Sequence, residues 1–160
     1  MDFIIQTRGA QMFITGPSVI KQVTGEDVSA EDLGGPEAQM GYSGVVHFIA
    51  DDDQDAVRIC KKLLSFIPSN NLDDPPRMPF NGDIGLDEGL NSLIPDDPKK
   101  AYDVHDVIHR IVDDADFLEV QNGFAENMVV GFGRLAGWSV GIVANNPAVK
   151  AGVLDIDSSD

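Results

Sequence analysis

Two stretches decide the fold of this chain: YDVHDVIHRIVDD at 102–114 and MVVGFGRLAGWSVGIVANNP at 128–147. The first predicts a helix with one apolar side, because its apolar residues recur at i, i+3, i+4, i+7 and i+8. These residues are Val104, Val107, Ile108, Ile111 and Val112. Asp103 comes directly before them and is the expected N-cap.

The second stretch predicts a β-hairpin. Apolar runs at 128–135 and 139–144 flank Ala136-Gly137, a dipeptide suited to a tight turn. Another short strand is expected at 117–120. Gly131-Phe132-Gly133 resembles the start of a nucleotide loop, but it lies inside an apolar strand, so close packing explains the glycines better. A helix followed by these strands predicts a mixed α/β fold.

Short apolar runs in the N-terminal third, at 2–5, 12–15 and 45–50, predict further strands. Gly16-Pro17 opens a predicted helix, since proline suits the first helical turn. Thr15 is its expected cap.

Glycines punctuate the next part of the chain. Gly25 is expected to end the helix that begins at Gly16-Pro17. A second short helix is expected from Ser29 to the breaker Gly34-Gly35-Pro36.

The strongest helical pattern in the first half follows the acidic run 51–55. Its apolar stripe consists of Ala56, Ile59, Cys60, Leu63 and Leu64. The acidic run lies at the positive end of the helix dipole and Lys61-Lys62 near the negative end. Dipole complementation explains the run better than a divalent cation site does. Cys60 on the stripe is expected to fill the core rather than to act as a nucleophile.

Composition limits the possible functions of the 160 residues. Asp and Glu number 27 against 11 Lys and Arg, a formal net charge of −16. This charge argues against binding nucleic acid or an anionic membrane surface. At 42% hydrophobic residues the chain can bury a core. A single Cys and the lack of a charged-then-apolar leader led us to expect a cytoplasmic location.

A proline-rich segment divides the chain. Residues 68–100 contain six prolines, a composition typical of a linker. We therefore expect three parts, 1–67, 68–100 and 101–160. The apolar run 153–156 is followed by Ser158-Ser159-Asp160, a helix-capping sequence after which no helix is expected.

Few residues indicate side-chain chemistry. His105 and His109 have the i, i+4 spacing of the zinc-protease motif HExxH, but the acid is Asp106 and a recognisable third ligand is missing. Trp138 is expected to be an exposed or half-buried hairpin aromatic rather than a ligand platform. Gly16-Pro17 could present amides to an anion. Ordinary turn chemistry explains it equally well.

Five runs nevertheless resemble one family: MFITGPSVIKQVTGEDVSAEDLGG (12–35), KKLLSFIPSNN (61–71), YDVHDVIHRIVDD (102–114), DFLEV (116–120) and VGIVANNPAVKAGVLDIDSSD (140–160). They resemble the carboxyltransferase subunit of biotin-dependent acyl-CoA carboxylases, of the propionyl-CoA carboxylase β-chain type. Methylmalonyl-CoA decarboxylases and transcarboxylases share the pattern, and both remain alternatives.

The resemblance implies a crotonase-like ββα-superhelix. The first part, 1–67, would end an N-terminal domain, 68–100 would connect the domains, and 101–160 would start a C-terminal domain. It also implies an enzyme of the ligase class, assembled as a hexamer, with biotin carboxyl carrier and biotin carboxylase components as partners. Carboxylated biotin on a separate carrier would deliver CO2 to an acyl-CoA such as propionyl-CoA. Backbone N–H groups would stabilise the oxyanions. No bound metal is implied.

The resemblance places two pocket-lining segments in this chain. One is the turn FITGP, with Thr15, Gly16 and Pro17, and the other is the strand end ANNP, with Asn145 and Asn146. Both oxyanion elements are expected outside these residues, so no catalytic residue is assigned and the chain is expected to be an inactive fragment by itself. A non-catalytic assembly module that docks on the full-length subunit is the rival hypothesis.

Three residues depart from the family pattern. Gln39 stands where His is expected, and His105 and Trp138 stand where Arg is expected. Exchanging Arg for either residue removes a permanent charge and a bidentate donor. If those arginines pair across an interface, this variant would assemble less well.

Overall fold

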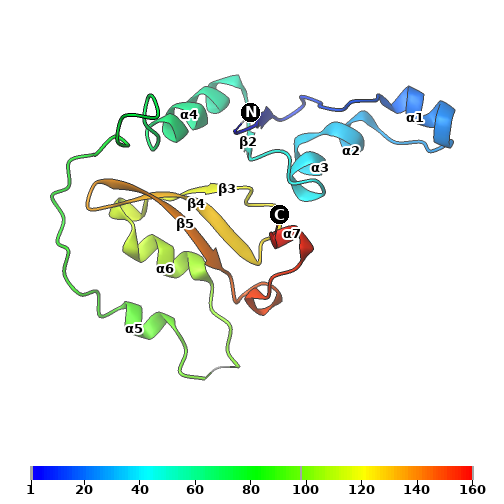
Figure 1. The fold of residues 1–160 in the computed structure, drawn as a ribbon. Coiled ribbons are helices and arrows are strands. Elements are labelled where there is room, and N and C mark those ends of the chain that lie inside the picture. The colour runs from blue at the N-terminus through cyan, green and yellow to red at the C-terminus, as the bar shows by residue number, and fades with distance from the viewer. Residues whose placement is uncertain (1, 98, 160) are drawn as a thin grey trace. The chain divides into compact units, whose positions relative to one another are not determined.

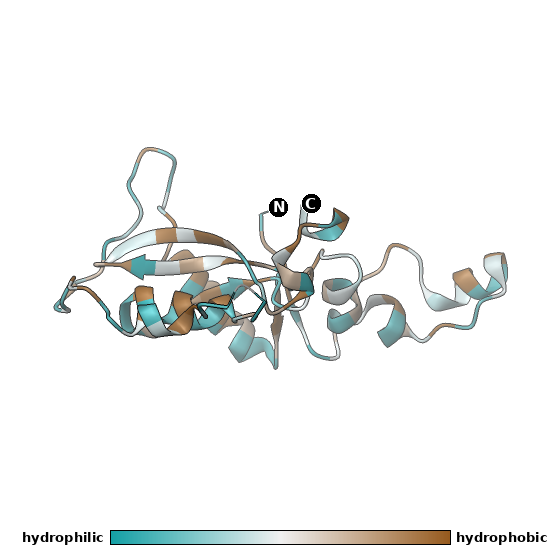
Figure 2. Ribbon diagram, turned by 90° about the horizontal axis from the view of Figure 1, so that it is seen from below, coloured by the Kyte–Doolittle hydropathy of each residue, from teal (hydrophilic) through white to brown (hydrophobic). Residues whose placement is uncertain are grey.

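The computed structural model describes residues 2–97 and 99–159 of the chain (Figure 1). It divides into two compact units, Met1–Cys60 and Lys61–Asp160, which are described one after the other. The helices of both units carry hydrophobic as well as hydrophilic residues along their length (Figure 2). Within the described residues, no helix is both long and apolar enough to cross a membrane.

The first unit contains a two-stranded parallel sheet. Strand β1 (Ile5–Thr7) pairs with β2 (Phe48–Ala50), with Ile5 opposite Phe48. Strand β1 is shifted along the chain from the predicted run 2–5, with which it shares only Ile5, and β2 covers the second half of the predicted run 45–50. The strand predicted at 12–15 is wrong: these residues form a loop, in which the Met12 N–H donates to the Gly34 carbonyl at 2.8 Å.

Three helices follow one another between these strands: α1 (Pro17–Thr24), α2 (Ala30–Gly34) and α3 (Pro36–Gly41). Gly25 ends α1 in the left-handed conformation, as predicted, at φ 79°. Thr15 is not the cap of α1, because Gly16 occupies the N-cap position and no side chain bonds to the helix start.

Helices α2 and α3 share the Gly-Gly-Pro segment. Helix α2 begins directly after Ser29, close to the predicted start, and Ser29 is its N-cap, since its Oγ accepts from the Asp32 N–H at 3.0 Å. Helix α3 was not predicted. Pro36 breaks α2, yet the same fixed φ suits the first position of the next helix.

Helix α4 (Asp53–Leu64) has acidic residues in its first turn and Lys61 and Lys62 in its last, as predicted. Of its apolar stripe, only Leu63 is buried. Cys60 is exposed, so the prediction that it fills the core is wrong. Ala56 and Ile59 are partly buried, and Leu64 is exposed like Cys60.

The second unit is built on an antiparallel sheet of three strands in the order β3-β4-β5. The strands are β3 (Leu118–Val120), β4 (Met128–Leu135) and β5 (Trp138–Asn145). The predicted hairpin is confirmed, and its turn lies at Ala136 and Gly137 with φ of 50° and 80°. Two positive φ values are typical of the type I′ turn that joins twisted strands.

Helix α6 (Val104–Ile111) runs alongside this sheet (Figure 1). Asp103 is its N-cap, as predicted, and accepts from the His105 N–H at 3.0 Å. The core between helix and sheet consists of Val104, Ile108, Val112 and Val129, with Phe117, Ile142 and Ala144 packed against it. The apolar side predicted from helical spacing is therefore the side that is buried.

Close packing explains the two glycines of β4. A Cβ at Gly131 would lie 2.5 Å from the Leu118 carbonyl oxygen and from the Phe117 ring. A Cβ at Gly133 would lie 2.8 Å from Val112. Larger residues would push β4 away from its neighbours.

The remaining elements are short. Residues 68–97 are irregular, as their prolines predict, except for α5 (Leu90–Leu93). Two 3-10 turns follow α6 and β5 respectively, η1 (Asp113–Ala115) and η2 (Lys150–Gly152). Ser158 and Ser159, read from the sequence as a helix-capping pair, instead lie inside a short helix, α7 (Ile156–Ser159). Asp160 and Pro98 lie outside the described residues.

Candidate functional site

The predicted turn Thr15-Gly16-Pro17 lies at the start of α1, in the first unit. The Gly16 carbonyl accepts from the N–H groups of Val19 and Ile20, at 3.1 and 3.3 Å. Pro17 has no N–H and fixes the backbone direction of the first turn. The side chain of Thr15 remains exposed, so its hydroxyl is accessible to a ligand.

A cavity of about 550 Å³ adjoins this turn. Its lining is mostly apolar and contains no charged side chain: Met12, Phe13, Ile14, Thr15, Ile20, Leu33, Gln39 and Val45. Such a cavity suits an apolar or neutral group better than a charged one, because burying an unpaired charge is costly. Among the predicted site residues, Thr15 is the one that lines it.

Gln39 closes one side of this cavity through its amide. Its Nε2 donates to the carbonyls of Met12 and Leu33, at 2.9 and 3.3 Å, and its Oε1 accepts from the Ser43 hydroxyl. Gln39 thus ties α3 to the loop before α1. The side chain that departs from the family pattern is used to hold the wall of the cavity.

The predicted residues Asn145 and Asn146 lie where β5 ends, in the second unit. Asn146 is buried, and its Oδ1 accepts from the N–H groups of Val104 at 3.3 Å and Ala148 at 3.2 Å. Asn145 is exposed, and its Nδ2 donates to the Gly152 carbonyl at 2.6 Å. Asn146 therefore shapes the strand end, whereas Asn145 lies at the surface.

His105 lies next to this strand end, in the first turn of α6. Its Nδ1 is 2.6 Å from Asp103 Oδ1 and its Nε2 is 3.0 Å from Glu119 Oε2. Burial lowers the pKa of His105, but the hydrogen bonds and charges of these carboxylates outweigh burial and raise it above its ordinary value. The backbone N–H of His105 lowers the pKa of Asp103, and the imidazole adds to that effect.

His109 lies one turn further along α6, with 6.4 Å between the two imidazole centroids. Glu119 and Asp103 face His105 rather than a shared centre with His109. Across residues 2–97 and 99–159, no three His, Cys, Asp or Glu side chains are grouped so that they could hold a metal ion.

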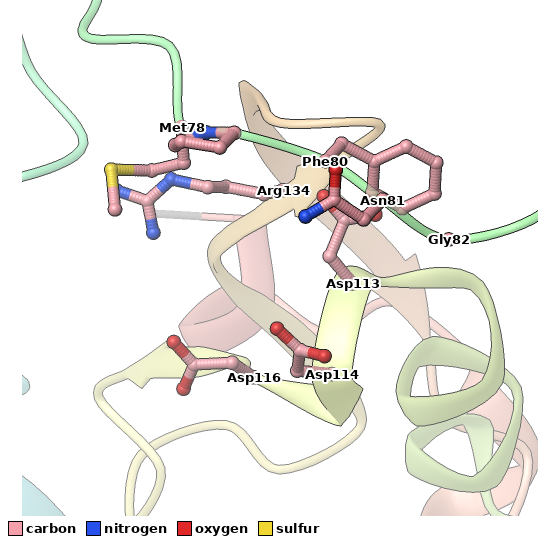
Figure 3. A pocket seen from close by; sticks show the side chains of 9 residues that line it. Met78, Phe80, Asn81, Gly82, Asp113, Asp114, Asp116 and Arg134 are labelled. Atoms are coloured by element: carbon pink, nitrogen blue, oxygen red, sulfur yellow. The ribbon is translucent and has the colours of Figure 1, made fainter.

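A second cavity of about 550 Å³ lies between the connection 78–82 and the hairpin (Figure 3). Asp113, Asp114, Asp116 and Arg134 supply its charged groups, and Arg134 lies beside Met78, across from Asp114 and Asp116. Two of these carboxylates have a structural role. Asp113 accepts from the amides of Ala136 and Gly137, and Asp116 pairs with Lys62.

Arg134 and Trp138 anchor the hairpin at its two sides. Arg134 stacks over Phe66 at 4.2 Å and donates to the Ser65 carbonyl at 2.9 Å. Trp138 is half exposed, as predicted, and carries the Arg77 guanidinium over its ring at 4.4 Å. The Met78 N–H also donates to the Gly137 carbonyl at 2.9 Å, so the connection is fixed to the hairpin tip.

Sequence reasoning missed the roles of Asp113 and Arg134. Asp113 stands in an acidic run after a helix, a pattern that usually indicates a solvated surface. The contact between its carboxylate and a turn 23 residues away has no local signal. For Arg134, the signal was its single charge in an otherwise apolar strand.

Comparisons with known proteins agree over the whole chain. The carboxyl transferase domain family matches residues 1–160. The methylmalonyl-CoA carboxyltransferase 12S subunit of Propionibacterium freudenreichii subsp. shermanii is 55% identical over 159 residues, covering 99% of this chain and 30% of its own length. The propionyl-CoA carboxylase carboxyltransferase subunit of Haloferax mediterranei is 48% identical over 161 residues, covering 99% and 31%.

Solved structures agree as well. Transcarboxylase 12S, a hexamer crystallised with hydrolysed methylmalonyl-CoA, matches with a TM-score of 0.97 and 55% identity over 99% of this chain and 32% of its own. A single-chain long-chain acyl-CoA carboxylase matches with a TM-score of 0.79 and 27% identity, over 99% of this chain and 15% of its own. The chain spans about a third of the length of the two curated relatives from Propionibacterium and Haloferax.

The resemblance inferred from the sequence runs and the predicted carboxyltransferase fold are both confirmed by these matches. They extend over both units, including the segments that hold Thr15 and Asn145. The chain therefore belongs to the carboxyl transferase domain family.

Proposed function

We propose that this chain forms part of a biotin-dependent carboxyltransferase, which moves a carboxyl group between biotin on a separate carrier protein and an acyl-CoA. The observation that carries the proposal is the 55% identity and 0.97 TM-score to transcarboxylase 12S across 99% of the chain. That relative was crystallised with hydrolysed methylmalonyl-CoA. Propionyl-CoA is accordingly the first acceptor to test.

The proposal includes the division into domains. Residues 1–67 would end an N-terminal crotonase-like domain, 68–100 would connect the domains, and 101–160 would begin the C-terminal domain. The irregular backbone of 68–97, broken only by α5, supports the connecting role. Oligomeric assembly and contact with a carrier and a biotin carboxylase belong to the same proposal.

Thr15, Gly16 and Pro17 in the first unit, and Asn145 and Asn146 in the second, are proposed as pocket-lining residues, each group within its own unit. In this role Thr15 offers a free hydroxyl on an apolar cavity wall, and Asn145 offers an exposed amide. Asn146 and Pro17 shape the backbone, since one is buried with its Oδ1 occupied and the other has no N–H. None of the five is assigned a catalytic step.

The net charge of the chain indicates that it supplies only part of the CoA-binding site. CoA carries several phosphate charges, whereas this chain has a formal net charge of −16. Attraction of a polyanion needs a local excess of basic groups. We therefore propose that the basic contacts to CoA come from other parts of the enzyme.

The test is a graft into the relative. The matching residues of the Propionibacterium 12S subunit are replaced by this chain, and transfer from carboxybiotin to propionyl-CoA is measured as methylmalonyl-CoA. We expect the hexameric graft to retain turnover and the isolated chain to show none. An assembled graft without turnover would contradict the proposal, and turnover by the isolated chain would contradict the supporting role.

Two variants of the graft test the pocket assignment. N145A should raise KM for propionyl-CoA by about 10-fold, as expected for the loss of one hydrogen bond worth about 1.4 kcal/mol. N122A, an exposed Asn in a surface turn, is the matched control and should leave KM unchanged. Equal KM values for both variants would remove Asn145 from the pocket.

A second candidate function is favoured by the exposed apolar side chains. Ile14, Tyr42 and Leu86 are 88–106% exposed, which is unusual for large apolar residues unless a partner covers them. The chain would then dock on a full-length carboxyltransferase subunit without chemistry. Size-exclusion chromatography of this chain with the 12S subunit tests the candidate, and separate elution counts against it.

A further inference from the structure

His105 faces two carboxylates with its two ring nitrogens. Nδ1 lies 2.6 Å from Asp103 Oδ1 and Nε2 lies 3.0 Å from Glu119 Oε2. Ionised carboxylates only accept hydrogen bonds, and a neutral imidazole has a single N–H. Both contacts are satisfied together only when the ring is doubly protonated, so the geometry itself selects the cationic form.

The surroundings of His105 are otherwise simple. The titratable groups that face it are Asp103 at the start of its own helix, Glu119 on β3 and His109 one turn along α6. Within residues 2–97 and 99–159, β4 and η1 direct no charged side chain to its ring by a hydrogen bond or ion pair. The two carboxylates therefore decide its protonation.

A chain of hydrogen bonds leads from His105 to the strand end. Asp103 Oδ1, which pairs with the ring, also accepts the backbone N–H of His105 as the N-cap of α6. The preceding N–H, that of Val104, donates to Asn146 Oδ1 at 3.3 Å. Val104 and Asn146 are both buried, so neither group has water as a replacement partner.

We propose that His105 is a positioning residue, which in its cationic form holds the first turn of α6 in place and thereby fixes Asn146 at the end of β5. When the ring loses a proton, one of the two carboxylates faces a lone pair instead of a donor. When the remaining proton is on Nε2, Asp103 loses the ring as a donor and keeps only the backbone N–H of His105, and the Val104–Asn146 hydrogen bond weakens. An effect of Asn146 on substrate binding rests on the proposed function, in which the end of β5 lines the substrate pocket.

The raised pKa of His105 supports this order of events. An ordinary histidine titrates near pH 6.5, and a raised pKa moves the change of charge to a higher pH. Below the titration of His105 the strand end is held, and above it Asn146 is released. Arginine at this position would remain cationic throughout.

The test is an NMR titration of the full 160-residue chain from about pH 5.5 to 8.5, the range in which histidine changes charge. The ring signals of His105 are assigned by their loss in H105R. We expect the ring to be doubly protonated at about pH 6.5, and the Val104 amide and the Asn146 side-chain amide to shift with the same midpoint. The readout needs no substrate, so it is independent of the carboxyl-transfer assay.

Two variants separate positioning from general stability. H105R should hold the Val104 and Asn146 signals at their low-pH positions across the whole range. H109Q, the matched control on the same helix, should leave their titration unchanged. A His105 ring that is neutral at about pH 6, or an Asn146 signal that ignores the His105 midpoint, would overturn the proposal. If H105R does not fold, the ring signals that persist in both H47Q and H109Q are those of His105, the third histidine of the chain, and the titration of the unmodified chain decides.

Discussion

At the scale of single residues, Asp113 shows how one carboxylate can fix a turn. Its Oδ1 accepts from the Ala136 N–H at 2.9 Å and its Oδ2 from the Gly137 N–H at 2.7 Å. Ala136 has a φ of 50°, a conformation that costs energy for a residue with a side chain. The carboxylate offsets this cost by pairing both amides of the hairpin tip.

D113A should lower the free energy of unfolding of the second unit by about 1.5–3 kcal/mol, the range for hydrogen bonds to a charged group. Urea unfolding followed by the fluorescence of Trp138, the single tryptophan of the chain, measures it. D83A is the matched control, because Asp83 is exposed in the irregular connection. Equal losses for both variants would show that Asp113 does not hold the turn.

At the scale of elements, β4 is the central strand of the second unit, and the neighbouring strands and helix α6 pack around it. It pairs with β3 on one side and β5 on the other, and α6 packs against it through Val129. The approach is close enough at Gly131 that a methyl group would meet the Leu118 carbonyl and the Phe117 ring. Gly141 on β5, by contrast, has open space where its Cβ would be.

G131A should therefore destabilise the second unit by about 1–3 kcal/mol, the usual cost of overpacking. G141A should be neutral or stabilise it by up to about 1 kcal/mol, because alanine restricts the unfolded chain. Urea midpoints of the two variants provide the comparison. If G141A destabilised as much as G131A, close packing at Gly131 would not explain the loss.

The element-scale predictions succeeded where a pattern was long and failed where it was short. Helix α6 and the β4–β5 hairpin follow their sequence patterns closely. The four-residue run 12–15 is a loop, because its backbone pairs with Gly34 instead of a strand. Short apolar runs carry too little periodicity to choose between these outcomes.

At the scale of the whole molecule, charge dominates. The formal net charge of −16 comes from 27 acidic against 11 basic residues, so repulsion among carboxylates exceeds what ion pairs can offset. The ion pairs at the surface, such as Lys150–Asp155 and Arg110–Asp87, are individually weak. Salt that screens the repulsion among carboxylates should therefore stabilise the folded chain.

Added NaCl, at about 0.5 M, should raise the urea midpoint at pH 7, because it shortens the range of repulsion to a few ångströms. The same concentration of NaCl at pH 4.2, the sequence pI, is the control and should have little effect. A midpoint that falls with salt at pH 7 would mean that the surface ion pairs outweigh the repulsion.

Acid should destabilise the chain because it protonates carboxylates that are hydrogen-bonded or paired in the folded state. Lys150 and Ser158 hold the pKa of Asp155 well below its usual range, and Arg110 lowers that of Asp87. Lowered carboxyl pKa values contribute stability that is present above the unfolded value of about 3.8 and is lost as the pH falls through the folded values. The urea midpoint should therefore decrease below about pH 4, and D155N should make that decrease smaller.

The sequence by itself determined the family, the α/β class, helix α6 with its cap and the hairpin that packs on it. These follow from local periodicity, turn chemistry and matching runs, which are properties of neighbouring residues. Only the tertiary structure decided that Asp113 holds the hairpin tip, that Cys60 is exposed and that His105 lies between two carboxylates. Each of these depends on residues brought together, or left uncovered, by packing between elements, and no local pattern records such contacts.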